Sequence, residues 1–311
     1  MNNKESRFLD FDRDISTKVK NGVKRNELLK NHIFFRIGGE ADYFIEPESI
    51  DDLKEVICLC NDCGIDRYVI GNGTNLLASD AGFRGAIIKV GSNFSHIEFT
   101  ENRIVVGAGA LLSSVSKRSA ELGLKGLDFA CGIPGYIGGA VAMNAGAYNG
   151  EIADTIRKVK CMSENGEIVE LTKDEMNFGY RTSKIFDDNL IVLEAEFELE
   201  RGNTEEILDR IAFINAKRKA SQPLDYPSAG STFKRPVGGY ASKLIQDAGL
   251  KGYKYGGAMV SDKHSGFVVN YNHATCEEVM ELMNHVAENV NKQFGIKLEP
   301  EVRIIGDFNR K

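Results

Sequence analysis

The sequence has no tryptophan, only six prolines and only five histidines among its 311 residues. It also lacks an excess of basic residues, because 39 lysines and arginines are outnumbered by 45 acidic residues, which gives a net charge of −6. A general nucleic-acid-binding protein would show a basic face, so no nucleic-acid partner is expected. An anionic substrate stays open, since a local basic pocket can lie in an acidic protein.

Long apolar runs are absent as well. No stretch approaches the roughly 18 apolar residues that a bilayer span requires, and the opening residues MNNKESRFLDFDRD contain no apolar signal core. We therefore expect a cytoplasmic protein without a membrane partner. With 42% hydrophobic and 27% charged residues, the composition is typical of a globular chain that buries a substantial core.

Three of the six cysteines form the pattern C-x-C-x2-C at Cys58, Cys60 and Cys63. No fourth cysteine or histidine is nearby to complete a tetrahedral site, so no metal is expected. The segment instead predicts a helix, with Ser49 as its N-cap and Gly64 as its end. Thiols that pack as small apolar groups suit a reducing compartment. The expected buried stripe of this helix is Leu53, Val56, Ile57 and Cys60.

Helices and short strands are mixed along the rest of the chain. Residues 1–30 are expected to be mainly helical, and further helices are expected at 49–64, 111–123, 203–220, 240–247 and 276–294. Strands are expected at 41–47, 67–71, 85–90, 96–100, 103–109, 193–200, 258–260, 267–271 and 298–306, with a hairpin at 159–171 that turns at Asn165-Gly166. This mixture predicts an α+β protein, without the regular βαβ alternation of a doubly wound sheet.

The first of two glycine-rich segments is VIGNGTNLLASD, residues 69–80. Its glycines let the backbone bend sharply, and successive N–H groups in such a turn form an anion-binding nest. It is not a dinucleotide-binding fingerprint of the Rossmann type, because position 76 is leucine where that pattern needs glycine. A simple turn is the alternative.

The second is CGIPGYIGGAVAMNAGAYNGE, residues 131–151. It lacks the Gly-Lys-Ser/Thr ending of a Walker loop, and it is too apolar for a flexible linker. Small residues at this density allow a flat ligand to approach the backbone, so ligand binding is favoured over packing alone. Two such loops could hold the two halves of one dinucleotide.

The segment PSAGSTFKRP, residues 227–236, contains a serine that invites comparison with a nucleophile. The nucleophile elbow G-x-S-x-G is not matched, because position 233 is phenylalanine, and the histidines show no partner spacing. A serine hydrolase is therefore disfavoured. Lys234 and Arg235 could instead grip a phosphate and so orient a substrate with Ser231 over its reacting end.

Three charged residues in two segments complete the set. Arg181 in FGYRTSKIF is an ordinary surface residue unless an anion lies beside it, where its planar fork can hold a carboxylate. Glu299 and Glu301 in EPEVRIIG are expected to share one face of a strand. They are either edge charges that face water or a source of a carboxylate beside a reacting centre.

Together these five segments resemble the family of UDP-N-acetylenolpyruvoylglucosamine reductases, flavoenzymes that make UDP-N-acetylmuramate for peptidoglycan. The likeness runs from about residue 31 to residue 306, and it is to the branch with the shorter substrate loop. The resemblance implies an FAD-binding, vanillyl-alcohol-oxidase-like (PCMH-type) fold. Two α+β subdomains at 1–90 and 91–202 would be followed by an α+β substrate-binding domain at 203–298, with a strand at about 299–311 returning to the first.

The resemblance also implies noncovalent FAD, with NADPH as electron donor. The sequence marks no interface, so a monomer is expected by default. Some relatives link flavin through a histidine after a Gly-Gly pair, and here RIGGEAD has Glu40 at that place. The residues expected to contact FAD are Gly71, Asn72, Gly73, Thr74, Asn75, Leu76, Pro134, Gly135, Ile137, Gly138, Gly139, Ala140, Asn144 and Gly146.

Three catalytic roles are implied in the same way. Ser231 matches the family's proton donor, Arg181 the arginine that stabilises the enol intermediate, and Glu301 its acidic partner. The expected substrate contacts are Tyr180, Ser228, Gly230, Lys234, Arg235 and Gln246. One departure is Ser221, which stands where relatives often carry lysine before Gln-Pro-Leu; Arg218 or Lys219 could substitute.

The implied substrate is UDP-N-acetylglucosamine enolpyruvate, an enol ether of pyruvate. Hydride from reduced flavin N5 would add to its terminal CH2, and Ser231 would protonate the α-carbon while Arg181 stabilises the negative charge that develops there. An FAD-dependent oxidase or dehydrogenase of a hydroxy acid or sugar is the alternative enzyme. A UDP-sugar binding module without catalysis is disfavoured, because two cofactor-type loops would then serve no purpose.

Overall fold

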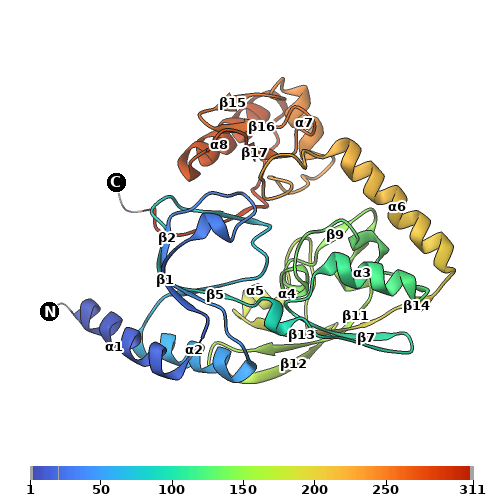
Figure 1. The fold of residues 1–311 in the computed structure, drawn as a ribbon. Helices are drawn as coiled ribbons and strands as arrows, with labels where there is room; N and C mark the ends of the chain where they lie inside the picture. The colour runs from blue at the N-terminus through green and yellow to red at the C-terminus, as the bar shows by residue number, and fades with distance from the viewer. Residues whose placement is uncertain (1–2, 20, 309–311) are drawn as a thin grey trace. The chain divides into compact units, whose positions relative to one another are not determined.

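The structure is a computed structural model that describes residues 3–19 and 21–308 (Figure 1). The chain forms two compact units, and neither is one continuous segment. Unit 1 comprises Met1–Arg25, Tyr43–Asn72 and Gly85–Lys217, and unit 2 comprises Asn26–Asp42, Gly73–Arg84 and Arg218–Lys311. The three-part division expected from the sequence stays a prediction.

The first part of the chain contributes a four-stranded sheet with the strand order β1-β2-β5-β3, in which β3 and β5 are parallel. Helix α2 has the predicted ends, since the Ser49 hydroxyl accepts a hydrogen bond from the Asp52 N–H at 3.0 Å and Gly64 is left-handed with φ +61°. The elements are α1 (Asn3–Lys18), β1 (Val23–Leu28), η1 (Leu29–Asn31), β2 (Glu40–Ile45), α2 (Ile50–Cys63), β3 (Arg67–Ile70) and β5 (Phe83–Lys89).

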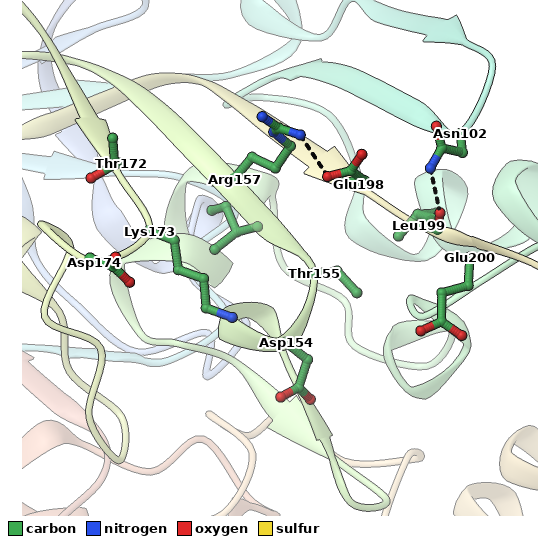
Figure 2. Close-up of a pocket in the computed structure, with 11 residues that line it drawn as sticks. Asn102, Asp154, Thr155, Arg157, Thr172, Lys173, Asp174, Glu198, Leu199 and Glu200 are labelled. Atoms are coloured by element: carbon green, nitrogen blue, oxygen red, sulfur yellow. Dashed lines mark hydrogen bonds and ion pairs between the residues drawn. The ribbon is translucent and has the colours of Figure 1, made fainter.

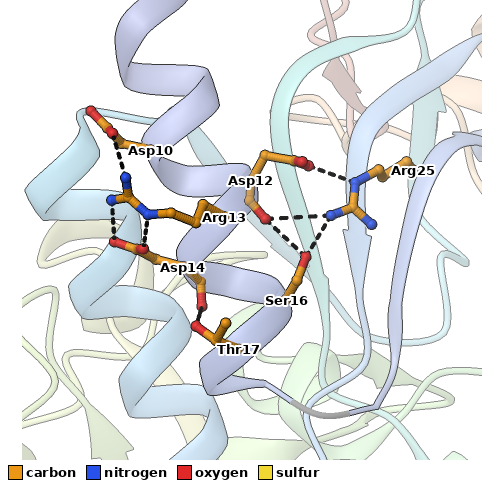
Figure 3. Close-up of polar contacts among 7 residues, drawn as sticks. All are labelled: Asp10, Asp12, Arg13, Asp14, Ser16, Thr17 and Arg25. Carbon is orange, nitrogen blue, oxygen red and sulfur yellow. Dashed lines mark hydrogen bonds and ion pairs between the residues drawn. The ribbon is translucent and has the colours of Figure 1, made fainter.

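The prediction of helix through most of residues 1–30 was wrong at its end. Helix α1 stops at Lys18, and the chain turns at Gly22, whose left-handed φ of +77° an L side chain rarely adopts. Strand β1 follows, and Arg25 at its third position ties it to the helix. Figure 3 shows the Arg25 guanidinium donating to the Asp12 carboxylate at 2.6 Å and to the Ser16 hydroxyl at 2.7 Å.

A five-stranded antiparallel sheet in unit 1 has the order β12-β11-β13-β7-β6. The predicted hairpin is confirmed, with Gly166 at φ +78° between β11 and β12. Strand β13 alternates buried and partly exposed residues along its second half, as predicted. The elements are η2 (Ser92–Phe94), β6 (Ile97–Thr100), β7 (Arg103–Gly107), α3 (Leu112–Glu121), β8 (Leu124–Lys125), η3 (Asp128–Ala130), α4 (Ile137–Ala142), β9 (Gly146–Ala147), β10 (Gly150–Glu151), η4 (Ile152–Asp154), β11 (Ile156–Met162), β12 (Ile168–Thr172), α5 (Lys184–Asp187), β13 (Ile191–Glu198), β14 (Glu200–Arg201) and α6 (Thr204–Ser221).

Unit 2 is built around the long helix α8 and a three-stranded sheet of order β15-β16-β17. Helix α8 begins with a capping box between Thr275 and Glu278, and the Asp80 carboxylate accepts from the N–H groups of Cys276 and Glu277. The elements are β4 (Leu76–Ala78), α7 (Ala241–Asp247), β15 (Lys254–Tyr255), β16 (Ala258–Val260), β17 (Val268–Asn270), α8 (Cys276–Phe294) and β18 (Arg303–Ile305).

The last predicted strand is shorter than expected. It covers only β18, which pairs in parallel with β4, so Glu299 and Glu301 precede the strand and do not share one of its faces. An isolated bridge between Phe233 and Pro300 holds the segment before it. Both acids flank this bridge, since the Glu299 carbonyl accepts from the Lys234 N–H and the Glu301 N–H donates to the Thr232 carbonyl, each at 2.8 Å.

Each unit has its own apolar packing. The core of unit 1 includes the fully buried side chains of Phe11, Leu53 and Phe197, and a smaller cluster in unit 2 joins Met259, Phe267 and Val269. The predicted stripe of α2 is buried throughout. Cys60 lies in this stripe, and burial raises the pKa of its thiol to about 12, so it behaves as a small apolar group.

Within the part of the chain that the structure describes, no cluster of three or more His, Cys, Asp or Glu side chains is arranged to hold a metal ion. None of the helices described has the length and apolarity that crossing a membrane would take.

Candidate active site

The two glycine-rich segments meet in unit 1. The Asn72 side-chain amide donates to the carbonyl oxygen of Pro134 at 2.5 Å. A Cβ built on Gly71 would lie 3.6 Å from side-chain atoms of Tyr136, so the two turns are in van der Waals contact. Residues that the sequence assigns to one cofactor from distant segments are thus brought together.

The second glycine-rich segment is hydrogen-bonded to residues 108–110 and has open space beside Gly139. The N–H groups of Ile137 and Gly138 donate to the carbonyls of Ala110 and Ala108, and a Cβ on Gly138 would come within 3.1 Å of the Ala108 side chain. A Cβ on the exposed Gly139 would meet no described atom within 4 Å. This backbone leaves room for a flat group to lie against it, which fits the flavin or the nucleotide part of FAD.

The remainder of the first glycine-rich segment, Gly73 to Leu76, belongs to unit 2. Gly73 has φ +65°, and a Cβ there would lie 2.3 Å from the carbonyl oxygen of His32, so only glycine fits. The Asn75 side chain donates to the Glu301 carbonyl at 3.1 Å, and the Asn75 carbonyl accepts from the Arg303 N–H. This places one expected cofactor residue beside the expected acidic partner.

Ser231 and Glu301 lie on neighbouring backbone segments of unit 2. The Thr232 carbonyl accepts from the Glu301 N–H at 2.8 Å, and the Thr232 N–H donates to the Gly266 carbonyl at 2.8 Å. The Ser231 side chain is exposed, whereas Thr232 next to it is buried. Two residues that are 70 positions apart in the sequence, with expected roles as proton donor and acidic partner, are therefore side by side.

The cations that follow Ser231 have partners. The Lys234 ammonium lies 3.4 Å from the Glu299 carboxylate, and the Arg235 guanidinium stacks 4.0 Å from the centre of the Tyr240 ring. Both pairs are on the surface. Of the other expected substrate contacts, Ser228 forms a bridge to Val269, Gly230 is left-handed with open space at its Cβ position, and Gln246 is exposed on α7.

Arg181 belongs to unit 1, where it contacts the second glycine-rich segment. Its guanidinium donates to the Gly146 carbonyl at 2.9 Å and lies 4.8 Å from the centre of the exposed Tyr180 ring. Its own backbone is left-handed, with φ +58°, which is uncommon for a residue with a side chain. The arrangement brings Arg181 beside one of the residues expected to contact FAD.

Three side chains near these residues were not found from the sequence. The Ser183 hydroxyl donates to the Ala142 carbonyl at 2.9 Å, and the Thr232 hydroxyl accepts from the Val268 N–H at 2.8 Å. The His264 ring accepts from the Gly266 N–H, and its burial lowers the pKa of the imidazole below 6.5. Each partner is either distant in the sequence or positioned by a turn, so no local sequence pattern predicts these contacts.

A cavity of about 670 Å³ lies elsewhere on unit 1, at the ends of β11, β12 and β13 (Figure 2). Its polar lining includes Lys173 and the ion pair between Arg157 and Glu198, which are 2.6 Å apart. None of the residues assigned from the sequence lines it. This cavity therefore gives no support to the assigned residues, which rest on the glycine turns and the paired segments around Ser231.

Comparison with known proteins identifies the family of the chain. A family profile described as "UDP-N-acetylenolpyruvoylglucosamine reductase, C-terminal domain" matches residues 222–305, and one described as "FAD binding domain" matches residues 41–172. The chain is 48% identical over 285 residues to the UDP-N-acetylenolpyruvoylglucosamine reductase of Clostridium botulinum, covering 92% of this chain and 93% of that protein. It is 46% identical over 304 residues to that of Clostridium tetani, covering 96% and 98%.

Solved structures show the same relationship. The UDP-N-acetylenolpyruvylglucosamine reductase of Thermus caldophilus superposes with a TM-score of 0.79 at 35% identity, over 91% of this chain and 98% of that one. A glucose oxidase variant of Phl p 4, at 15% identity and a TM-score of 0.50 over 69% of this chain, shares the fold alone. The expected α+β, PCMH-type FAD-binding fold is confirmed. The chain belongs to the UDP-N-acetylenolpyruvoylglucosamine reductase family and is an FAD-dependent oxidoreductase.

Proposed function

We propose that this protein reduces UDP-N-acetylglucosamine enolpyruvate to UDP-N-acetylmuramate with NADPH as electron donor, in the synthesis of peptidoglycan precursors. The observation that carries this proposal is the pairing of the Ser231–Thr232 segment with Glu301, which sets the expected proton donor and its acidic partner on adjacent backbones. The relatives' printed names support the same reaction.

The glycine turns would hold FAD without a covalent link. Asn72, Pro134 and Gly139 present backbone and a side-chain amide at the place where the two segments meet, and Gly139 leaves open space beside its backbone. Glu40 stands after the Gly38-Gly39 pair, and a carboxylate does not form the histidyl link of some relatives. When bound, FAD supplies the hydride that the terminal vinyl carbon accepts.

Arg181 would stabilise the negative charge that develops as the vinyl group is reduced. This charge lies on the α-carbon and spreads into the substrate carboxylate, and a fixed guanidinium lowers the energy of that state. The positioning of Arg181 supports this role, because its contact with the Gly146 carbonyl fixes the guanidinium before a substrate arrives. Less reorganisation is then needed during the reaction.

Ser231 would give its hydroxyl proton to the α-carbon and would not act as a nucleophile. A serine is a weak acid in water, but a positioned hydroxyl can protonate a strongly basic enolate. Glu301 would act as its acidic partner from the adjacent segment. The Lys234 ammonium would stabilise the negative charge of the resulting alkoxide. It is also paired with the Glu299 carboxylate, so the two anions would share this cation.

Anaerobic stopped-flow absorbance of the flavin band tests the proposal. NADPH should bleach the band, and subsequent addition of UDP-N-acetylglucosamine enolpyruvate should restore it. Bleaching without recovery would retain the flavoenzyme but reject this substrate. Recovery with a hydroxy acid's keto product, or bleaching by a hydroxy acid or sugar, would favour the oxidase alternative.

A further inference from the structure

The turn that carries Arg181 is held by a side chain from the second glycine-rich segment. Gly179 and Thr182 exchange both backbone hydrogen bonds across the turn, so Arg181 lies at its tip. The Asn144 side-chain amide donates to the Gly179 carbonyl at 3.1 Å. The base of the turn is thereby tied to a residue 35 positions earlier in the chain.

Both the oxygen and the nitrogen of the Asn144 side-chain amide are hydrogen-bonded within the protein. Its side-chain oxygen accepts from the Ala153 N–H at 3.0 Å, while its nitrogen serves Gly179. The residue is only 1% exposed, which leaves little of it available to a ligand. The Gly179 carbonyl also accepts from the Thr182 N–H, so loss of the Asn144 donor would leave it with one of its two hydrogen bonds.

The backbone of Asn144 contributes as well. Its carbonyl lies 3.5 Å from one guanidinium nitrogen of Arg181, whose other terminal nitrogen donates to Gly146. Asn144 is left-handed, with φ +42°, a conformation that asparagine tolerates better than most residues. Arg181 is also left-handed, and such a backbone persists only where its surroundings hold it.

We propose that Asn144 is a positioning residue for Arg181, and that its contribution to the reaction runs through the Gly179 carbonyl and not through contact with FAD. This inference rests on the proposed role of Arg181. It revises the expectation from the sequence that Asn144 binds the cofactor. Displacing a reacting group by about 1 Å can cost about 100-fold in rate, so anchoring of this turn bears directly on catalysis.

Asn144→Asp separates the two hydrogen bonds. Aspartate keeps an oxygen for the Ala153 N–H but cannot donate to the Gly179 carbonyl when ionised. We expect reoxidation of reduced flavin by the enolpyruvyl sugar to slow by roughly 100-fold, with FAD affinity and flavin reduction by NADPH unchanged. Asn149→Asp makes the same change at an exposed position of the same segment, and it should leave all three quantities unchanged.

Amide hydrogen exchange of the protein without FAD gives a second readout. Asn144→Asp should speed exchange at residues 179–182, and Asn149→Asp should not. If Asn144→Asp weakens FAD binding while exchange at 179–182 stays as in the unmodified protein, Asn144 is a cofactor ligand and the proposal is overturned. Unchanged reoxidation in this variant would overturn it equally.

A double-mutant cycle with Arg181→Ala separates this inference from the proposed function. If Asn144 acts through Arg181, the double variant should be no slower in reoxidation than Arg181→Ala alone. Additive losses would show that Asn144 acts independently and would overturn the inference while leaving the role of Arg181 intact. If Arg181→Ala itself reoxidises at the normal rate, the proposed role of Arg181 fails, and the inference fails with it.

Discussion

The turn that carries Arg181 and the segment that carries Ser231 differ in how much buried side chains add to their backbone hydrogen bonds. In unit 1, the buried Asn144 side chain donates to the Gly179 carbonyl, and the buried Ser183 side chain donates to the Ala142 carbonyl. In unit 2, the backbone groups of Thr232 pair with those of Gly266 and Glu301. A turn held by side chains depends on particular residues, whereas a segment held by its backbone tolerates many substitutions. The two regions should therefore respond differently to mutation.

The largest effect on activity should come from Ser231→Ala. Loss of the proton donor should slow substrate reduction by roughly 100- to 10,000-fold, the range for general acid catalysis, while flavin reduction by NADPH continues. Because Ser231 is exposed and its segment is held by backbone, thermal unfolding should be unchanged. Stopped-flow measurement of each half-reaction decides the matter: an equal loss in both would reject Ser231 as proton donor.

Ser183→Ala should lower the stability of the protein, in contrast to Ser231→Ala, which should lower only its activity. The Ser183 side chain is fully buried and its hydroxyl donates to the Ala142 carbonyl, so its removal should lower the free energy of unfolding by about 1–3 kcal/mol. Denaturant titration measures this loss. Ser114→Ala on the exposed face of α3 is the control and should be nearly neutral. A neutral Ser183→Ala would remove the contrast between the two regions.

Thr232→Val sharpens the comparison, because Thr232 is an exception to the backbone rule in unit 2. Valine fills nearly the same volume but cannot accept from the buried Val268 N–H, so we expect a loss of about 1–2 kcal/mol in unfolding free energy. Thr232→Ser keeps the hydroxyl and should recover most of it. If the valine and serine variants were equally stable, this hydroxyl would have no part in holding the segment.

The pH dependence of stability should report on His264, which lies in the turn whose Gly266 carbonyl accepts from the Thr232 N–H. Burial lowers the pKa of His264 below its ordinary 6.5, so below pH 6.5 the unfolded chain binds protons that the native protein does not. The contribution of this histidine to stability is present above pH 6.5 and is lost as the pH falls through its native pKa. His264→Asn should flatten the unfolding free energy in that window, and an unaltered pH profile would contradict the assignment.

The smallest effect should come from Lys234→Met. The ion pair between Lys234 and Glu299 is exposed on both sides, and such pairs contribute about 0–1 kcal/mol. Stability should therefore hardly change and should become less sensitive to salt. A loss well above 1 kcal/mol in denaturant titration would show that side chains matter more in this segment than its backbone pairing suggests.

The sequence predicted those elements whose ends are set locally. Helix α2 between Ser49 and Gly64 and helix α8 at Cys276–Phe294 were found because caps and apolar periodicity lie within a few residues. Strand β1 was missed, since Val23–Leu28 lacks clear alternation and is a strand only through its neighbour in the sheet. Strand β18 was predicted too long, because its pattern continues before Arg303 while only Arg303–Ile305 has a strand partner, β4.

The candidate site shows a similar division. Glycine-rich turns and an isolated serine beside two cations could be recognised as residue types, and the resemblance supplied roles for them. The contacts of Ser183 and Thr232 could not be predicted, because their partners lie 41 and 36 residues away. Whether Asn144 turns toward a ligand or toward Gly179 is likewise decided only by tertiary structure.

Because β4 pairs with β18 near the end of the chain, this part of the fold can form only late in synthesis. Asn75 and Glu301, which adjoin these strands, are 226 residues apart, so on a ribosome that adds 5–20 residues per second the first waits roughly 10–45 s for the second. During this interval β4 has no strand partner, and an unpaired strand edge is open to wrong pairing. A nascent chain without residues 301–305 would carry nearly all of its apolar core, yet the surroundings of Asn75 and Glu301 would form only when those last residues emerge.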